Sequence, residues 1–333
     1  MSNVVELPLI APIYSTYHRQ GPGSAIVSEN VSIRNWYLNQ VMNLTCNRKF
    51  LTGFTTPEID IQNSATLANP HIYRSGVSMQ FAKGHIHTII REMLSQGYYV
   101  LFGKIDDYYI AGKSWYMERH FAHDGLICGY DPNEKAYCVY AYDTNWVYRK
   151  FWTPQKGFEK GRKVMEDQGI YGSTCAIKPK PYVVDFSPET AIASIEEYLN
   201  SSLEIFPFNG DGDVFGIVVH MYMAEYLTKL EDGSIPYEKM DWRVFRLIWE
   251  HKRAMLWRIE AIEHTLCLDN KLSEAYKPLV AEADAIRMLY ASHHMKRRDS
   301  LLPIIRRKLL MMMLKEKDIL TILVEAMKTG CVG

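Results

Sequence analysis

GLICGYDPNEKAYCVYAY, residues 125–142, is the stretch of this chain that decides its fold. Two apolar runs, 125–130 and 137–142, flank the residues Asp131-Pro-Asn133. Short apolar runs bounded by turn residues are typical of strands, and Asp, Pro and Asn each favour a tight turn. The stretch therefore predicts an antiparallel β-hairpin.

The segments on both sides of the hairpin continue this mixed pattern of helix and strand. Apolar residues recur at helical spacing in some segments, and aromatic and β-branched residues gather in others. The expected elements are, in chain order, a helix at 27–44, a helix at 85–95 that Gly97 ends, strands at 98–102 and 105–110, a strand at 146–152, and a short helix opening at Thr153-Pro154.

The part of the chain from about residue 187 to 329 has a different character and reads as almost wholly helical. Long segments with apolar residues at helical spacing lie at 215–230, 241–266, 274–294 and 301–328. Apolar stripes of this kind indicate packing into a helical core. We therefore expect the fold class α+β, with an α+β domain over residues 1–184 and an all-α helical domain over residues 185–333.

Composition excludes several classes of protein. Of the 333 residues, 38 are Lys or Arg and 38 are Asp or Glu, so the formal net charge is zero, which argues against a dedicated nucleic-acid binder. No run reaches the roughly 18 apolar residues of a membrane span, and the N-terminal residues do not resemble a secretory signal. The six cysteines are scattered, with no CxxC pair. We expect a cytoplasmic protein with reduced thiols and no membrane partner.

His123 and Asp143 form the most informative pair of polar residues. His123 stands at the start of the first hairpin strand, and Asp143 follows the end of the returning strand. The two side chains should therefore lie at one end of the sheet, where the carboxylate can orient the imidazole and leave its second nitrogen to act as a base. This arrangement is the His–Asp half of a Cys–His–Asp triad. A histidine held only structurally by a turn carboxylate remains the alternative.

Other histidines and basic residues have simpler interpretations. The pairs His120/His123 and His85/His87 suggest a metal site, but an HxxH in an extended segment does not place both rings on one face. We therefore expect neither a metal nor a cofactor. The basic stretches at 293–298 and 306–308 are interpreted as solvated helix surfaces or as a patch for an acidic partner protein.

The nucleophile is harder to identify. Papain-like enzymes carry a cysteine at the start of the first long helix, where the helix dipole lowers the thiol pKa. Cys46 stands instead at the far end of the expected 27–44 helix, which points to a structural thiol. Ser24 and Ser28 lie near the helix start. Ser28 is the serine we assign to catalysis, and a plain helix cap is its alternative role.

Several stretches of the first domain resemble a known family. They are the residues at 97–100, 106–110, 120–131 and 146–148, with weaker likeness at Trp36, Asn43-Leu44 and 253–262. The stretch at 120–131 reads HFAHDGLICGYD and contains His123. These stretches resemble the N-terminal type of butirosin-biosynthesis acyltransferases, which are papain-like and related to C39 cysteine peptidases. Proteins of this type accompany antibiotic and nonribosomal-peptide clusters, and the amide synthetase of closthioamide formation is similar.

The resemblance implies a papain-like fold and transfer of an acyl group from a carrier-protein thioester to a small-molecule amine or a peptide. His123 matches the family's general base, and Asp143 matches its orienting carboxylate. No cysteine stands at the helix start, so three routes stay open. A serine serves as nucleophile, the amine attacks the thioester directly, or the protein is a non-catalytic member that binds a peptide or an acyl or peptidyl carrier protein.

Overall fold

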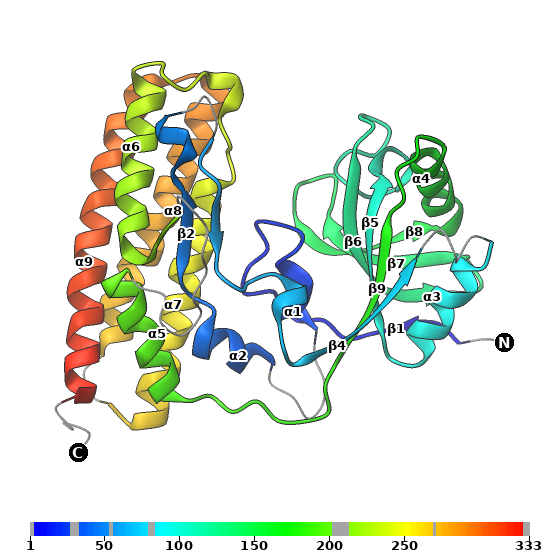
Figure 1. Cartoon of the computed structure of the whole chain (residues 1–333), viewed down its shortest axis with the longest axis horizontal. Coiled ribbons are helices and arrows are strands. Elements are labelled where there is room, and N and C mark those ends of the chain that lie inside the picture. Colours follow the sequence, from blue (N-terminus) through cyan, green and yellow to red (C-terminus); the bar gives the residue numbers. More distant parts are fainter. Residues whose placement is uncertain are drawn as a thin grey trace. The chain divides into compact units, whose positions relative to one another are not determined.

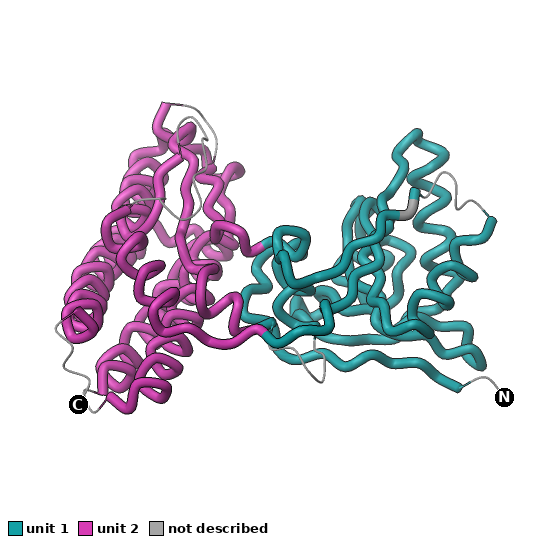
Figure 2. The backbone as a smooth tube through the Cα atoms, turned by 60° about the horizontal axis from the view of Figure 1, so that its bottom comes forward, with its two compact units in different colours: residues 1–33, 65–183 teal, residues 34–64, 184–333 magenta. Residues whose placement is uncertain are grey.

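The computed structural model describes residues 3–26, 33–52, 56–78, 84–201, 213–268 and 271–328. The chain forms two compact units. Unit 1 contains residues 1–33 and 65–183, and unit 2 contains residues 34–64 and 184–333 (Figure 2). The helices and antiparallel sheets make the protein an α+β structure with a helical C-terminal region, as the sequence predicted at that level.

Unit 1 is built on a seven-stranded sheet in which every pair is antiparallel (Figure 1). The strand order is β4-β9-β5-β6-β7-β8, and β1 pairs with β6 off this path. The strands are β1 (Val5–Glu6), β4 (Ile72–Ser78), β5 (Tyr99–Asp106), β6 (Ala122–Asp131), β7 (Ala136–Tyr142), β8 (Tyr148–Pro154) and β9 (Ser173–Pro179).

Two helices of unit 1, α3 (Ile86–Ser95) and α4 (Gln155–Asp167), pack on the sheet. Ile90 and Leu94 of α3 and Phe158 of α4 join one apolar cluster with residues of β5, β6 and β7. The close fit of α4 depends on Gly161, because a Cβ atom there would lie 2.8 Å from the carbonyl oxygen of Asp106. The short helix α1 (Gly21–Ala25) and two 3₁₀ turns, η2 (Thr66–Ala68) and η3 (Asp107–Tyr109), also belong to this unit.

The predicted hairpin is confirmed. β6 and β7 pair from Leu126↔Tyr140 to Asp131↔Ala136, and the Asp131 side chain accepts hydrogen bonds from the backbone N–H groups of Asn133 and Glu134 in the turn. Across this hairpin the sulfur atoms of Cys128 and Cys138 lie 3.5 Å apart, and both are free thiols.

Unit 2 is a helical bundle with a small sheet (Figure 1). Its helices are α2 (Ile33–Gln40), α5 (Pro188–Asn200), α6 (Val219–Glu231), α7 (Val244–Leu266), α8 (Leu272–Lys296) and α9 (Leu302–Lys328). The sheet has the order β10-β2-β3, with β2 (Leu44–Asn47), β3 (Ile59–Ile61) and β10 (Asp213–Phe215). Further 3₁₀ turns belong here, η1 (Arg48–Leu51), η4 (Gly216–Val218), η5 (Tyr237–Lys239) and η6 (Asp299–Leu301).

Unit 2 joins residues 34–64 to residues 184–333, whereas the sequence pattern predicted residues 34–64 in a first domain over 1–184. Two buried side chains of α7 hold this segment in the bundle. Arg258 donates to the carbonyls of Tyr37, Leu38 and Val41 at the end of α2, and His251 Nε2 lies 2.8 Å from the carbonyl of Met42. Side chains of the bundle thus bond carbonyls at and just beyond the end of α2, and the Tyr37 carbonyl also accepts from the N–H of Val41 at 3.0 Å.

The expected 27–44 helix also ends earlier in the structure, at Gln40. Within the described residues the helix is α2, and residues 27–32 lie outside them. Leu44 opens strand β2, which pairs with β3 on one side and with β10 on the other. Cys46 is therefore a strand residue, not the end of a helix.

The core of unit 2 contains a buried polar network. Glu316 of α9 accepts hydrogen bonds from Lys252 Nζ at 2.6 Å, from the Tyr198 hydroxyl at 2.9 Å and from the Tyr276 hydroxyl. Lys252 and Glu316 are both fully buried. A buried charge is tolerated only when it is paired and hydrogen-bonded, and this pair meets both conditions. Across the described parts of the chain, no helix is long and apolar enough to span a bilayer.

Candidate functional site

His123 and Asp107 form a hydrogen-bonded pair at one end of the large sheet. His123 lies in β6 opposite Ile105 of β5, and Asp107 follows the end of β5 directly. Nδ1 of His123 lies 2.9 Å from Oδ2 of Asp107, a fully buried carboxylate. Because an ionised carboxylate only accepts hydrogen bonds, Nδ1 is the protonated nitrogen of the neutral ring. Nε2 then carries the lone pair that can accept a proton.

Lys113 holds Asp107 from its other side. Its ammonium nitrogen lies 2.6 Å from Oδ1 of Asp107 and donates to the carbonyl of Asp124 at 2.7 Å. The Lys113 side chain is fully buried, so the pair exchanges hydration for these direct contacts. As a result the Asp107 carboxylate is fixed by one cation and one imidazole, and it presents a defined oxygen to His123.

His18 lies against His123, with ring centroids 4.0 Å apart. It comes from the segment before α1, which is tied down at several points. The Tyr142 hydroxyl donates to the carbonyl of Ser15 at 2.7 Å, and the N–H of Thr66 donates to the carbonyl of Arg19 at 2.6 Å. These bonds on both sides of His18 set its position relative to the sheet.

Two tyrosines complete the surroundings of His18. The rings of Tyr142 and Tyr148 lie 5.2 and 5.6 Å from the His18 ring, centroid to centroid. Burial, reinforced by the neighbouring Tyr140, Tyr142 and Asp124, raises the pKa of Tyr148 well above its ordinary value. Tyr148 is therefore a neutral phenol at physiological pH, and it contributes an uncharged aromatic side chain to the site.

Asp124 brings a second carboxylate to the two histidines. Its Oδ1 lies 3.7 Å from Nδ1 of His18 and 3.8 Å from Nε2 of His123. One ligand atom from each of the three residues lies within 4.8 Å of the others, which is the spacing of a group able to hold a metal ion. We call His18, His123 and Asp124 the two-histidine cluster.

Asp143 does not take the place that the sequence interpretation assigned to it, because Asp107 occupies Nδ1 of His123. The Asp143 side chain instead organises the turn between β7 and β8. It accepts from the N–H groups of Asn145 and Val147 at 2.8 and 2.9 Å and pairs with Arg149. Burial alone would raise the pKa of Asp143, but these bonds outweigh it and lower the pKa below its usual value.

The structure places no predicted nucleophile beside His123 among the residues it describes. Ser24 is buried in α1, and its hydroxyl accepts from the N–H of Ile13 at 3.0 Å. Cys46 lies in unit 2, and burial together with the charge of Asp213 raises the pKa of its thiol to about 12, which keeps it protonated. Ser28, the serine assigned to catalysis, lies outside the described residues.

A second His–Asp pair lies next to the first. His120 Nδ1 lies 2.7 Å from Oδ2 of Asp106, and the ring of His120 stacks on Tyr108 with centroids 4.3 Å apart. The side chain of His120 is 63% exposed, which makes it a surface residue. This pair is a natural internal control for the pair of the half-buried His123 and the buried Asp107.

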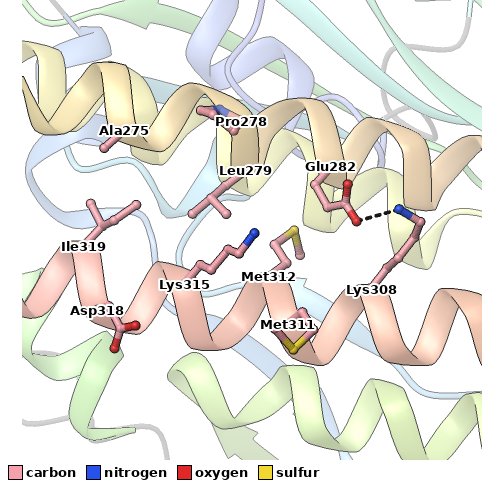
Figure 3. A pocket seen from close by; sticks show the side chains of 10 residues that line it. All are labelled: Ala275, Pro278, Leu279, Glu282, Lys308, Met311, Met312, Lys315, Asp318 and Ile319. Carbon is pink, nitrogen blue, oxygen red and sulfur yellow. Dashed lines mark hydrogen bonds and ion pairs between the residues drawn. The ribbon is translucent and has the colours of Figure 1, made fainter.

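Unit 2 has a pocket of about 490 Å³ between α8 and α9 (Figure 3). Leu279 and Met312 contribute apolar side chains, and Lys308 forms an ion pair with Glu282 at 2.9 Å within it. The pocket is lined by Ala275, Pro278, Leu279, Glu282, Lys308, Met311, Met312, Lys315, Asp318 and Ile319. This lining contains no cysteine or serine nucleophile, and Glu282, one of its two carboxylates, is paired with Lys308.

The sequence predicted solvated helix surfaces, or a patch for an acidic partner protein, at the basic stretches 293–298 and 306–308. In the structure, basic side chains of these stretches form ion pairs within unit 2. Arg306 pairs with Glu231 at 2.9 Å, and Lys308 pairs with Glu282. His293 is buried. These contacts remove part of the positive charge that a patch for an acidic protein needs.

Sequence reasoning missed Asp107, Lys113 and His18. Asp107 had a usable signal, since an acidic residue directly after one strand and a histidine at the start of the next meet when the two strands are antiparallel neighbours. His18 has no such signal, because its position depends on contacts between distant segments. Comparison with known proteins finds no matching family model and no matching curated protein.

Proposed function

We propose that unit 1 catalyses acyl transfer, moving an acyl group from a carrier-protein thioester to an amine. The observation that carries the proposal is the buried Asp107 carboxylate at Nδ1 of His123. The sequence resemblance supports the same reaction and a papain-like interpretation of the α+β unit. The free thiols of the described cysteines, Cys46, Cys128, Cys138, Cys175 and Cys267, support a cytoplasmic setting.

His123 acts as the base in the proposed reaction. The amine nitrogen attacks the thioester carbonyl carbon, and Nε2 of His123 takes the proton that the nitrogen loses. The carbon–sulfur bond then breaks, and the proton returns from Nε2 to the departing thiolate. The products are an amide and a free carrier thiol. Asp107 stabilises the imidazolium that forms between these two steps, and Lys113 keeps Asp107 in place.

Direct attack by the amine is the route that the site supports best. A thioester is already an activated acyl donor, so the reaction does not require an acyl-enzyme. The Ser24 hydroxyl is buried and bonded to the N–H of Ile13, and the Cys46 thiol is fully buried and kept protonated by its raised pKa, so neither is available as a nucleophile. An acyl-enzyme on Ser28 is the competing route.

The test combines product analysis with intact-mass spectrometry on the full chain. The protein is incubated with an acyl-pantetheine thioester and a simple primary amine, and amide formation and protein mass are followed together. We expect amide formation without a mass gain on the protein, and loss of most turnover in His123→Gln. His120→Gln is the matched control and should retain activity, because the exposed His120 pairs with Asp106 and not with Asp107.

Two results would redirect the proposal. A mass gain equal to the acyl group would favour the serine route, and peptide mapping would then locate the acylated residue. Unchanged turnover in His123→Gln would remove the base from the mechanism. The non-catalytic alternative predicts saturable binding of an acyl or peptidyl carrier protein with no amide formed from any thioester donor.

A further inference from the structure

The geometry points to a binding site for one divalent transition-metal ion of the Zn²⁺ type, formed by His18, His123 and Asp124 of the two-histidine cluster. This inference goes beyond the proposed acyl transfer and does not rest on it. Its basis is a set of three ligand atoms whose spacing and exposure fit one ion, with one of the two histidines held by a carboxylate as metal ligands commonly are.

The spacing suits tetrahedral coordination. Zinc bonds of about 2.0–2.2 Å place neighbouring tetrahedral ligand atoms about 3.4 Å apart. Oδ1 of Asp124 lies 3.7 Å from Nδ1 of His18 and 3.8 Å from Nε2 of His123. An inward shift of a few tenths of an ångström, within reach of side-chain torsions, would bring these oxygen–nitrogen distances to that value.

The orientation of His123 is already that of a metal ligand. Metal-bound histidines commonly donate their second ring N–H to a carboxylate, which fixes the tautomer and makes the free nitrogen a better ligand. Asp107 provides this carboxylate at Nδ1, and Lys113 holds Asp107 in turn. Nε2 carries the lone pair and lies 3.8 Å from Oδ1 of Asp124.

The exposure of the three ligands is graded. The side chain of His18 is 7% exposed, that of His123 is 24% exposed and that of Asp124 is 46% exposed. The site is therefore buried at His18 and open to solvent at Asp124. Three protein ligands with an open fourth position distinguish a site that accepts water or a substrate from a closed structural site.

The chemistry of the ligands selects the class of ion. Two imidazoles favour zinc and its neighbours over Mg²⁺ or Ca²⁺, which prefer oxygen ligands. One carboxylate and two neutral rings also give the three ligands a single net negative charge, which a divalent cation more than neutralises. The ion would use the same lone pair of His123 that the proposed base uses, so metal binding and base action exclude each other at that atom.

The test is a titration of the metal-free full chain with Co²⁺, a visible-absorbing substitute for Zn²⁺. We expect saturable absorption bands at one equivalent, abolished by excess Zn²⁺. His18→Ala and Asp124→Asn should each weaken Co²⁺ binding about 10-fold or more, and Asp107→Asn should weaken it about 10- to 100-fold. His120→Ala is the control and should bind Co²⁺ as the unchanged protein does, because His120 pairs with Asp106 outside the cluster.

Asp124→Asn is included because it is not expected to disturb the fold. Lys113 contacts the backbone carbonyl of Asp124, and the half-exposed side chain of Asp124 changes little in volume on substitution. The inference is overturned if Co²⁺ does not bind saturably, or if folded Asp124→Asn and His18→Ala bind it unchanged. No acyl donor enters this titration, so its failure leaves the acyl-transfer test intact, and the reverse also holds.

Discussion

The imidazole rings of His18 and His123 lie with their centroids 4.0 Å apart, although one belongs to the segment before α1 and the other to β6. This contact joins the N-terminal segment of unit 1 to the end of its large sheet. His123 is oriented from behind by Asp107, while Asp124 lies on the side of Nε2. Any reaction at His123 therefore takes place beside a second imidazole and a second carboxylate.

The first prediction concerns the proton on His123. Because Asp107 accepts from Nδ1, we expect the neutral ring to carry its proton on Nδ1. Long-range ¹⁵N–¹³C NMR correlations of labelled, metal-free protein distinguish the two tautomers. Asp143→Asn should leave the His123 signals unchanged, since Asp143 bonds the β7–β8 turn. A ring protonated on Nε2 would contradict the assigned pairing.

The second prediction separates two turns of similar design. Asp143→Ala removes the acceptor for the N–H groups of Asn145 and Val147 at a buried position, so we expect it to lower the free energy of unfolding by about 1–3 kcal/mol. Asp131→Ala removes the acceptor for two N–H groups in the exposed β6–β7 turn and should cost less than about 1 kcal/mol, since water replaces its bonds. Asp143→Ala also removes the ion pair with Arg149, but the Arg149 side chain is 59% exposed, so this pair contributes less than about 1 kcal/mol. Urea unfolding of both variants measures the difference. Equal losses would show that burial of Asp143 does not matter.

The hairpin and the helices could be predicted from the sequence because their signals are local. The turn Asp131-Pro-Asn133, the end of α3 at Gly97 and the apolar stripes of α7 each depend on neighbours in the chain. The small sheet of unit 2 gives no local signal, since β2 pairs with β10 across a long stretch of intervening chain. That pairing, together with Arg258 at the end of α2, moves residues 34–64 into unit 2.

The site was predicted in part for the same reason. Placing His123 at the end of a hairpin strand was correct, and a carboxylate does orient it. The choice between Asp143 and Asp107 depended on which neighbouring strand approaches Nδ1. The end of β5 and the start of β6 gave a signal for Asp107, but not for the exact register, because the β5–β6 pairing shifts between Phe102 and Ile105 and sequence patterns do not reveal such a shift.

The third prediction concerns the buried ion pair of unit 2. Glu316→Ala leaves the ammonium group of Lys252 buried without its counter-ion, and we expect a loss of about 3–5 kcal/mol in the free energy of unfolding. Glu282→Ala removes the partner of Lys308 in a pair that is one-third exposed, and it should cost less than about 1 kcal/mol. Chemical denaturation of both variants makes the comparison. If the two losses are similar, Lys252 is not the buried cation described above.

The fourth prediction concerns acid sensitivity, which two buried histidines of unit 2 should control. Burial, together with the nearby charge of Lys252, lowers the pKa of His220 to about 3 and lowers the pKa of His251 well below its ordinary value. A folded-state pKa below the unfolded value means that the unfolded chain binds more protons between the two. Stability is therefore fully present above about pH 6.5 and is lost as the pH falls.

The measurement is the free energy of unfolding between about pH 4.5 and 6.5, where each such histidine contributes a slope of roughly 1 kcal/mol per pH unit. His220→Gln should reduce the slope by about that amount, because glutamine binds no proton in either state. His264→Gln, at an exposed position of α7, should leave the slope as it is. If His220→Gln keeps the full slope, His220 is protonated in the folded bundle, and its packing beside Lys252 and Glu316 must differ from that described here.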